Sequence, residues 1–317
     1  MTTRVGSLGQ GQLLLDQLLQ QQNSLAVVQQ QLSTGHKADD LKGIARDASS
    51  LLSTKTLVSR AQQFIENNKQ LGLKLSSYDS ALQGVSGVAQ DLRDSVLQAI
   101  NLNSGTGLIE KVKNILGETL DQLNKQVNGE YIFGGTRTDQ PPVTVTTAAG
   151  LIALPEPPTA AFANNQLKPQ VKIDDNITVV YGQLADAVGA PLMHAIQRIL
   201  QFDAGTVPSG ATGPAGTFGS TLTAAQRDYL LGEVTNLNTV SQDLNEVTAQ
   251  NGVHQAELTK VQDRKNTEVN VLNGFISDIQ DVDTAGAITK LNQDHLALQA
   301  SYSVLSQLNK LSLLNFL

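Results

Sequence analysis

Histidine is the side chain most often used for acid–base catalysis and metal binding near neutral pH. This chain has four, His36, His194, His254 and His295. None has a second histidine or a carboxylate at the spacing of a metal-binding motif such as HExxH or an EF-hand loop. The histidines therefore predict neither a metal site nor a catalytic centre.

Other sequences that often carry chemistry are missing or incomplete. Cysteine is absent, which excludes disulfides, thiolate nucleophiles and zinc–sulfur centres. Gly9-Gln10-Gly11 lacks the preceding strand and third glycine of a dinucleotide fingerprint, and Gly134-Gly135 lacks the lysine and hydroxyl residue of a phosphate-binding loop. No GxSxG elbow occurs. We therefore expect no enzyme, no catalytic residue, no cofactor and no bound metal.

Several polar residues instead occupy regularly spaced helix positions. Asn251 and His254 follow apolar residues at alternating spacings of four and three, and Lys265 and Glu268 continue the same series. We interpret His254 and Asn251 as polar interruptions that set the register between paired helices. Lys265 and Glu268 are expected to meet opposite charges on a partner helix, because the alternative, an acid–base pair, would need a pocket.

Two long runs with this heptad spacing require helices that pair along one apolar seam. The first run is Leu57, Ala61, Phe64, Asn68, Leu71, Leu75, Tyr78, Leu82, Val85, Ala89, Leu92, Val96 and Ala99. The second is Leu237, Val240, Leu244, Val247, Asn251, His254, Leu258, Val261, Lys265, Glu268, Leu272, Phe275, Ile279 and Val282.

Each run is too long for an ordinary globular helix, since roughly 43 residues at 1.5 Å each span about 65 Å. Equal length and period predict that the two runs pair antiparallel as an α-helical rod. The residues expected to form the rod core are Leu71, Leu75, Tyr78, Leu82, Leu92, Leu237, Leu244, Leu258, Leu272 and Phe275.

Both ends of the chain carry a further amphipathic helix. The apolar positions expected to form assembly seams are Leu14, Leu18, Leu25, Val28, Leu32, Leu291, Leu298, Tyr302, Leu305, Leu308 and Leu311. Gln21 interrupts the first seam, and the outer face there is rich in glutamine. Seams without a partner cannot be buried in a single subunit, so residues 1–35 and 288–317 are expected to be disordered alone and helical in an assembly.

The composition changes at Glu130, where Thr, Val, Pro and Gly become frequent. Asn128-Gly129 is expected to end the preceding helix, and VTVTT is expected to be a strand. VKIDDNITVVYG is expected to form a pair of strands joined around Asp174-Asp175-Asn176, and 203–220 a flexible loop. Thr223 and Gln226 form a capping-box pattern at the start of the second long helix.

The expected fold is therefore mainly α, with a β-rich insertion. The expected domains are terminal assembly helices at 1–49 and 284–317, a helical rod at 50–130 and 223–283, and an outward-facing inserted domain at 131–222. An insertion of this kind should be removable without disturbing the rod.

Charge and hydropathy narrow the possible partners. The net charge is −7 and lysine and arginine are scattered, so neither nucleic acid nor an anionic membrane is an expected partner. No window of 18 apolar residues predicts a membrane span, and the N-terminal segment lacks the apolar core of a Sec signal peptide.

Three segments resemble a known family. QQLSTGHKADDLKGIA is similar to the N-terminal region of bacterial flagellins. NGEYIFGGTRTDQPPV and the tail ITKLNQDHLALQASYSVLSQLNKLSLLNFL resemble the flagellar hook–filament junction proteins (hook-associated protein 3) of the flagellin family.

The resemblance implies a structural subunit at the hook–filament junction, assembled through a coiled coil of its terminal helices. It also implies type III export without a cleaved signal peptide, an extracellular location in the flagellum, and a cytoplasmic chaperone at the C-terminal helices. The implied partners are copies of itself, a hook-associated protein on the hook side and flagellin on the filament side. The alternative is a filament-forming flagellin; self-polymerisation of the purified protein would favour it.

Overall fold

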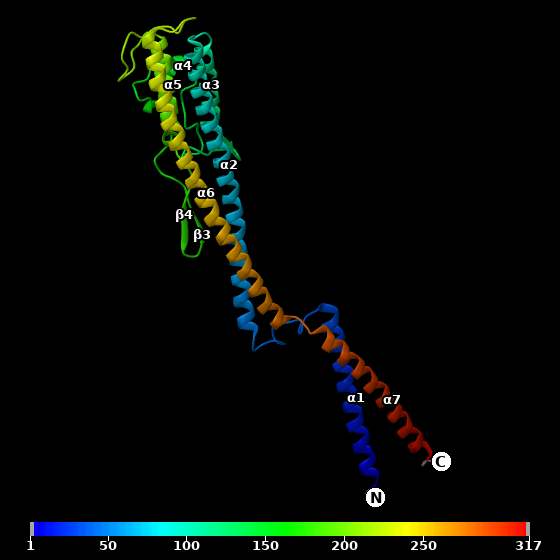
Figure 1. The fold of residues 1–317 in the computed structure, drawn as a ribbon. Helices are drawn as coiled ribbons and strands as arrows, with labels where there is room; N and C mark the ends of the chain where they lie inside the picture. Colours follow the sequence, from blue (N-terminus) through cyan, green and yellow to red (C-terminus); the bar gives the residue numbers. More distant parts are fainter. Residues whose placement is uncertain (1–2, 315–317) are drawn as a thin grey trace. The chain divides into compact units, whose positions relative to one another are not determined.

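The computed structural model describes the backbone of residues 3–314 and the side chains of residues 12–307. Helices dominate it, and the chain divides into two compact units (Figure 1). The terminal unit combines the residues up to Gln62 with those from Asn266 onward, and the central unit runs from Gln63 to Lys265. The two longest helices, α2 (Ala48–Leu102) and α6 (Ala224–Gln280), each contribute to both units.

Short polar signals set the ends of the helices in the terminal unit. Helix α1 (Thr3–Thr34) ends at Gly35, which has a left-handed φ of 77° and donates its N–H to the Gln31 carbonyl at 2.8 Å. Helix α7 (Thr284–Leu314) begins after Asp283, whose carboxylate accepts a hydrogen bond from the Ala285 N–H at 3.1 Å. Gly35 and Asp283 thus end and begin the two helices through local backbone and side-chain hydrogen bonds.

In the central unit, α2 and α6 run antiparallel, as the heptad runs predict. Lys265 lies 5.5 Å from the ring centre of Phe64, and the Asn251 amide donates to the Leu75 carbonyl at 3.0 Å. Residue numbers therefore fall along one helix as they rise along the other. The expected capping box also forms at the start of α6, where Thr223 and Gln226 exchange hydrogen bonds of 2.9 and 3.2 Å.

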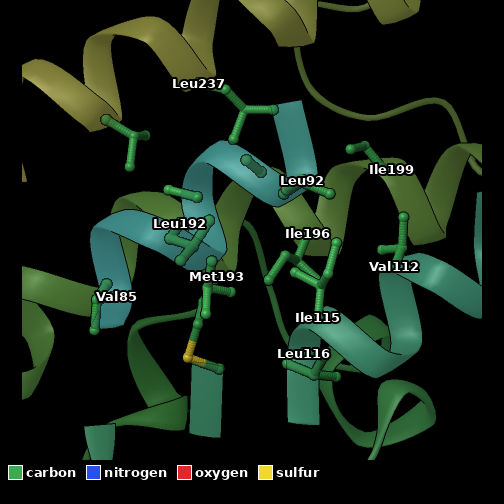
Figure 2. Packing of buried hydrophobic residues seen from close by; sticks show 14 of the residues in the cluster. Val85, Leu92, Val112, Ile115, Leu116, Leu192, Met193, Ile196, Ile199 and Leu237 are labelled. Atoms are coloured by element: carbon green, nitrogen blue, oxygen red, sulfur yellow. The ribbon is translucent and has the colours of Figure 1, made fainter. Parts of the chain in front are cut away.

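Two further helices complete the main hydrophobic core. Helices α3 (Leu108–Leu123) and α5 (Ala185–Asp203) direct apolar side chains at α2 and α6 (Figure 2). Val112, Ile115 and Leu116 come from α3, and Met193 and Ile196 come from α5. All five are buried, so the core of the central unit contains at least four helices rather than a two-helix seam.

The strands of the described chain lie in two small antiparallel hairpins. Strands β1 (Gln126–Val127) and β2 (Glu130–Tyr131) are joined by Asn128 and Gly129, both with positive φ, as in a type I′ turn. The expectation that Asn128-Gly129 caps the preceding helix is therefore wrong: α3 ends at Leu123, and the dipeptide turns a hairpin. Strands β3 (Gln170–Asp174) and β4 (Ile177–Val180) confirm the hairpin expected in VKIDDNITVVYG.

The expected VTVTT strand does not form. Val143 makes an isolated bridge to Phe162, and its N–H and carbonyl bond to the Asn124 side chain at 3.0 and 3.1 Å. A side-chain amide thus takes the place of a neighbouring strand. Helix α4 (Ala148–Ile152) and a 3₁₀ turn at Thr159–Ala161 follow. The fold class is mainly α with a small inserted β region, as predicted.

The insertion is not a separate outward domain, which corrects the sequence-based expectation. Phe133, Leu151 and the inner face of α5 belong to the same buried cluster as α2, α3 and α6. The loop at 203–220 is also held in place, because Phe218 is buried and its ring lies 5.6 Å from that of Phe202. Composition marked where the insertion begins, but apolar side chains within it pack onto the long helices.

Candidate assembly surfaces

Helices α1 and α7 pack antiparallel against each other within one chain. Leu18, Val28 and Leu298 are buried between them. The other predicted seam residues that are half-buried are Leu14, Leu25, Leu32, Leu291 and Leu305. The side chains of Leu308 and Leu311 lie outside the described part of the chain. The two seams thus cover each other, so the argument that they stay open in a single subunit is wrong.

Hydrogen bonds between side chains interrupt this apolar seam. Ser301 donates to the Gln21 side-chain oxygen at 3.0 Å, and Ser24 donates to Asp294 at 2.7 Å. Tyr302 was expected on the seam, but its side chain is 50% exposed and its hydroxyl accepts from Gln22 at 2.7 Å. Ser301 occupies the heptad position instead. The apolar pattern of the sequence did not indicate Ser301, because serine is not apolar.

Additional apolar side chains on the terminal helices face away from the seam. Leu15 and Leu19, one turn apart on α1, are 50% and 48% exposed. On α7, Leu296 and Val304 lie eight residues apart and are 66% and 44% exposed. Because residues three or four apart share a helix face, these positions form apolar rows outside the α1–α7 contact. We call Leu15, Leu19, Leu296 and Val304 the outer apolar rows.

A small polar bridge closes one end of the α1–α7 pair. The N–H of Val282 donates to the Gly35 carbonyl at 2.9 Å, and the N–H of Lys37 donates to the Gln280 carbonyl at 2.8 Å. Between them, the His36 ring lies 3.2 Å from the Asp281 carboxylate. The hydrogen bond from Ser277 and the contact with His36 lower the pKa of Asp281. His36 thus has a structural partner, and the sequence pattern did not reveal this partner.

Most of the predicted rod core is buried. The buried members are Leu71, Leu75, Tyr78, Leu82, Leu92, Leu237, Leu244 and Leu258. Leu272 is half-buried, and Phe275 is 55% exposed, so its assignment to the core is wrong. Ile276 is the more buried neighbour. A straight helix of 3.6 residues per turn drifts by about 20° per heptad, which moves the covered face from position 275 to 276.

Lys265 meets an opposite charge, although on a different element from the one expected. Its ammonium lies 2.8 Å from Asp174 at the end of β3, and Arg264 contacts the same carboxylate at 2.5 Å. Burial alone would raise the pKa of Asp174, but hydrogen bonds from Lys265, the Asp175 N–H and Arg264 lower it to about 2. The sequence predicted the charge of the partner, but not that an inserted hairpin supplies it.

A second charged group lies between α5 and α6, beside a groove of about 550 Å³. Arg198 donates to the buried carboxylate of Glu233 at 2.8 Å and lies 3.6 Å from Glu156. Burial would lower the pKa of Arg198, but the hydrogen bond and charge of Glu233 raise it. Arg198 also donates to the Ser209 carbonyl at 2.6 Å. The group therefore holds the 203–220 loop against the two helices.

Metal-binding clusters and membrane-spanning helices are both absent from the part of the chain that the structure describes. Among the described residues, no group of three or more histidine, aspartate or glutamate side chains could hold a metal ion. No described helix is long and apolar enough to cross a membrane. His194, His254 and His295 lie apart along α5, α6 and α7. Exposed apolar side chains of the described helices include the outer apolar rows.

Comparison with known proteins finds one family match and several similar solved structures. Residues 234–317 match the family of the bacterial flagellin C-terminal helical region. No curated protein sequence matches the chain. A solved flagellar hook-associated protein from Vibrio parahaemolyticus aligns with 75% of this chain and 100% of its own, with a TM-score of 0.60 and 16% identity.

Two further solved structures are less similar. Bacillus cereus FlgL covers 74% of this chain and 100% of its own, at 14% identity and a TM-score of 0.43. Flagellar hook-associated protein 3 from Legionella pneumophila covers 81% and 98%, at 12% identity and a TM-score of 0.36. The family match confirms the flagellin resemblance for the C-terminal helices, and the Vibrio structure shows the same fold.

Proposed function

We propose that this protein is a structural subunit of the bacterial flagellum that joins hook and filament through its terminal helices. The observation that carries the proposal is the flagellin match at residues 234–317, which contain α7 and most of α6. The hook-associated fold of the Vibrio protein supports it. So do the residues NGEYIFGG and SLLNFL, which resemble junction proteins.

In this proposal the outer apolar rows are the surfaces that meet neighbouring subunits. The α1–α7 seam is already filled by its own helices, so contacts between copies must use side chains outside it. Leu19 and Leu296 are suitable side chains, since they are 48% and 66% exposed and burying the remaining half of a leucine contributes roughly 1–2 kcal/mol. The protein would act outside the cell, without catalysis, and an export chaperone would hold its C-terminal helices before secretion.

Deleting the gene tests the assigned role. A junction subunit is needed to attach the filament, so the deletion strain should be non-motile while still secreting flagellin into the medium. Restoring the intact gene should restore motility. A deletion strain that retains attached filaments and swims would contradict the junction role.

A pair of substitutions tests the proposed surface. Leu19→Glu places a charge in the outer apolar rows, whereas Gln20→Glu places the same charge at the next position, which is also exposed. Both variants should be exported with unchanged helix content, but Leu19→Glu alone should lose incorporation into the flagellum. Equal incorporation of the two variants would exclude this row as the assembly surface.

The second candidate is a filament-forming flagellin, which the C-terminal family match also favours. The two functions differ in what the purified protein does. A flagellin should polymerise into long filaments when seeded, whereas a junction subunit should stop at short assemblies. Electron microscopy of seeded protein distinguishes them, and long filaments would replace the junction role with the flagellin one.

A further inference from the structure

The β3–β4 hairpin lies across the α2–α6 pair at the end of the central unit. Ile173 and Val179 from the hairpin are buried in a small cluster with Leu75 from α2 and Leu258 from α6. This cluster is separate from the main core, which α3 and α5 help to enclose. At the small cluster, the hairpin covers the apolar side of α2 and α6, as α3 and α5 do in the main core.

The paired helices carry polar residues where the hairpin docks. Asn68 interrupts the apolar series of α2; it is fully buried and its amide donates to the Ile173 carbonyl at 2.9 Å. On α6, the Lys265 side chain is only 6% exposed and lies 2.8 Å from Asp174. One hairpin therefore binds a polar residue of each helix.

These contacts leave α2 and α6 poorly matched without the hairpin. A buried ammonium that loses its carboxylate is strongly unfavourable, and so is a buried amide that loses its acceptor. Removing Ile173 and Val179 would also expose Leu71, Leu75, Leu258 and Val261 on one side. The two helices would relieve both costs by separating locally at this level and admitting water.

We propose that the β3–β4 hairpin is a strap that holds α2 and α6 closed at this end of the central unit. The Asp174–Lys265 ion pair fastens the hairpin: while the pair is formed, the small cluster around Leu75 and Leu258 excludes water. When the pair is broken, α2 and α6 separate locally around Leu71 and Leu258, and the main core enclosed by α3 and α5 stays folded. Local opening of this kind is possible because the two clusters share no buried residue, although half-buried Tyr181 packs against both.

Amide hydrogen exchange of the full-length protein at neutral pH tests the strap. Asp174→Asn removes the charge but keeps an oxygen that can accept from the Asp175 N–H, which bonds Asp174 at 2.8 Å. Protection should fall roughly 10- to 100-fold in α2 near Leu71 and in α6 near Leu258. Protection near Leu92 and Ile196, in the main core, should stay within about twofold of the original.

Two further variants make the result specific. Asp174→Asn combined with Lys265→Met removes the buried charge that has lost the Asp174 carboxylate and should recover most of the lost protection. Lys172→Gln changes an exposed charge on the same strand and should change nothing. The strap is refuted if Asp174→Asn leaves the amides near Leu71 and Leu258 protected, or if the main core loses protection equally. It is also refuted if adding Lys265→Met brings no recovery.

Discussion

Phe133 gives the sharpest test of the finding that the insertion belongs to the core. Its side chain is fully buried, and its ring meets that of Tyr78 edge-to-face with centres 5.5 Å apart. Tyr78 is itself buried on α2, and this burial raises the pKa of its hydroxyl. Phe133→Ala therefore removes a contact between the insertion and a long helix.

The expected loss of unfolding free energy is large. Truncating a buried phenylalanine costs about 3–5 kcal/mol. Losing its aromatic partner costs about 0.5–1.5 kcal/mol more than the buried area alone explains. We expect a total of about 4 kcal/mol, a large part of a typical stability of about 5–15 kcal/mol. If Phe133→Ala does not fold, Phe133→Leu should still fold with a loss of about 1–2 kcal/mol.

Phe275→Ala is the matched control, because this phenylalanine is 55% exposed and the same atoms are removed. Its effect should stay below about 0.5–1 kcal/mol. Urea unfolding followed by far-ultraviolet circular dichroism measures both variants. A loss below about 1 kcal/mol for Phe133→Ala, or equal losses for the two variants, would show that the insertion does not stabilise the long helices.

Three further predictions concern single contacts. Thr223→Ala removes the capping box of α6 and should lower the unfolding free energy by about 1 kcal/mol in urea titrations, with Thr235→Ala in the middle of the helix as the smaller comparison. Gly189→Ala would bring a methyl group within 2.3 Å of the buried Leu123 and should destabilise by about 1–3 kcal/mol, whereas Gly117→Ala in open space should stabilise by about 0.5–1 kcal/mol; the same sign for both would contradict the packing. Because the folded pKa of Asp174 is about 2, below its ordinary value, the stability it contributes is present above about pH 4 and is lost as the pH falls toward 2. Urea titrations across this range should show a shallower pH dependence for Asp174→Asn, and an unchanged slope would contradict the ion pair.

The sequence predicted the long helices well, because a period repeated over many heptads outweighs local exceptions. Leu75, Leu82 and Leu237 are buried as expected. Phe275 is exposed because a straight helix drifts against a strict heptad, so that Ile276 lies on the covered face in its place. Ser301 was missed because a small hydroxyl residue carries no apolar signal.

The insertion was harder to interpret, since its packing depends on contacts distant in sequence. No local pattern shows that Asn124 satisfies the backbone of Val143, or that Asp174 pairs with Lys265 some ninety positions later. Asn128-Gly129 has two common uses, helix cap and hairpin turn, and only the hairpin that follows decides between them. Of the predicted seam residues of the terminal helices, Leu18, Val28 and Leu298 are buried between α1 and α7, whereas their partner was expected in another subunit.

The antiparallel pairing of α1 with α7 has a consequence for the order in which the chain folds. The Gln22–Tyr302 contact joins residues 280 positions apart. Closing so long a loop in an unfolded chain costs about 5 kcal/mol of entropy, more than a few serine and glutamine hydrogen bonds return. Once the central unit has folded, Phe64 and Lys265 are already neighbours and most of that loop is closed. We therefore expect helix α1 to be among the last elements to find its partner, and the α1–α7 pair to be among the first to separate when the protein unfolds.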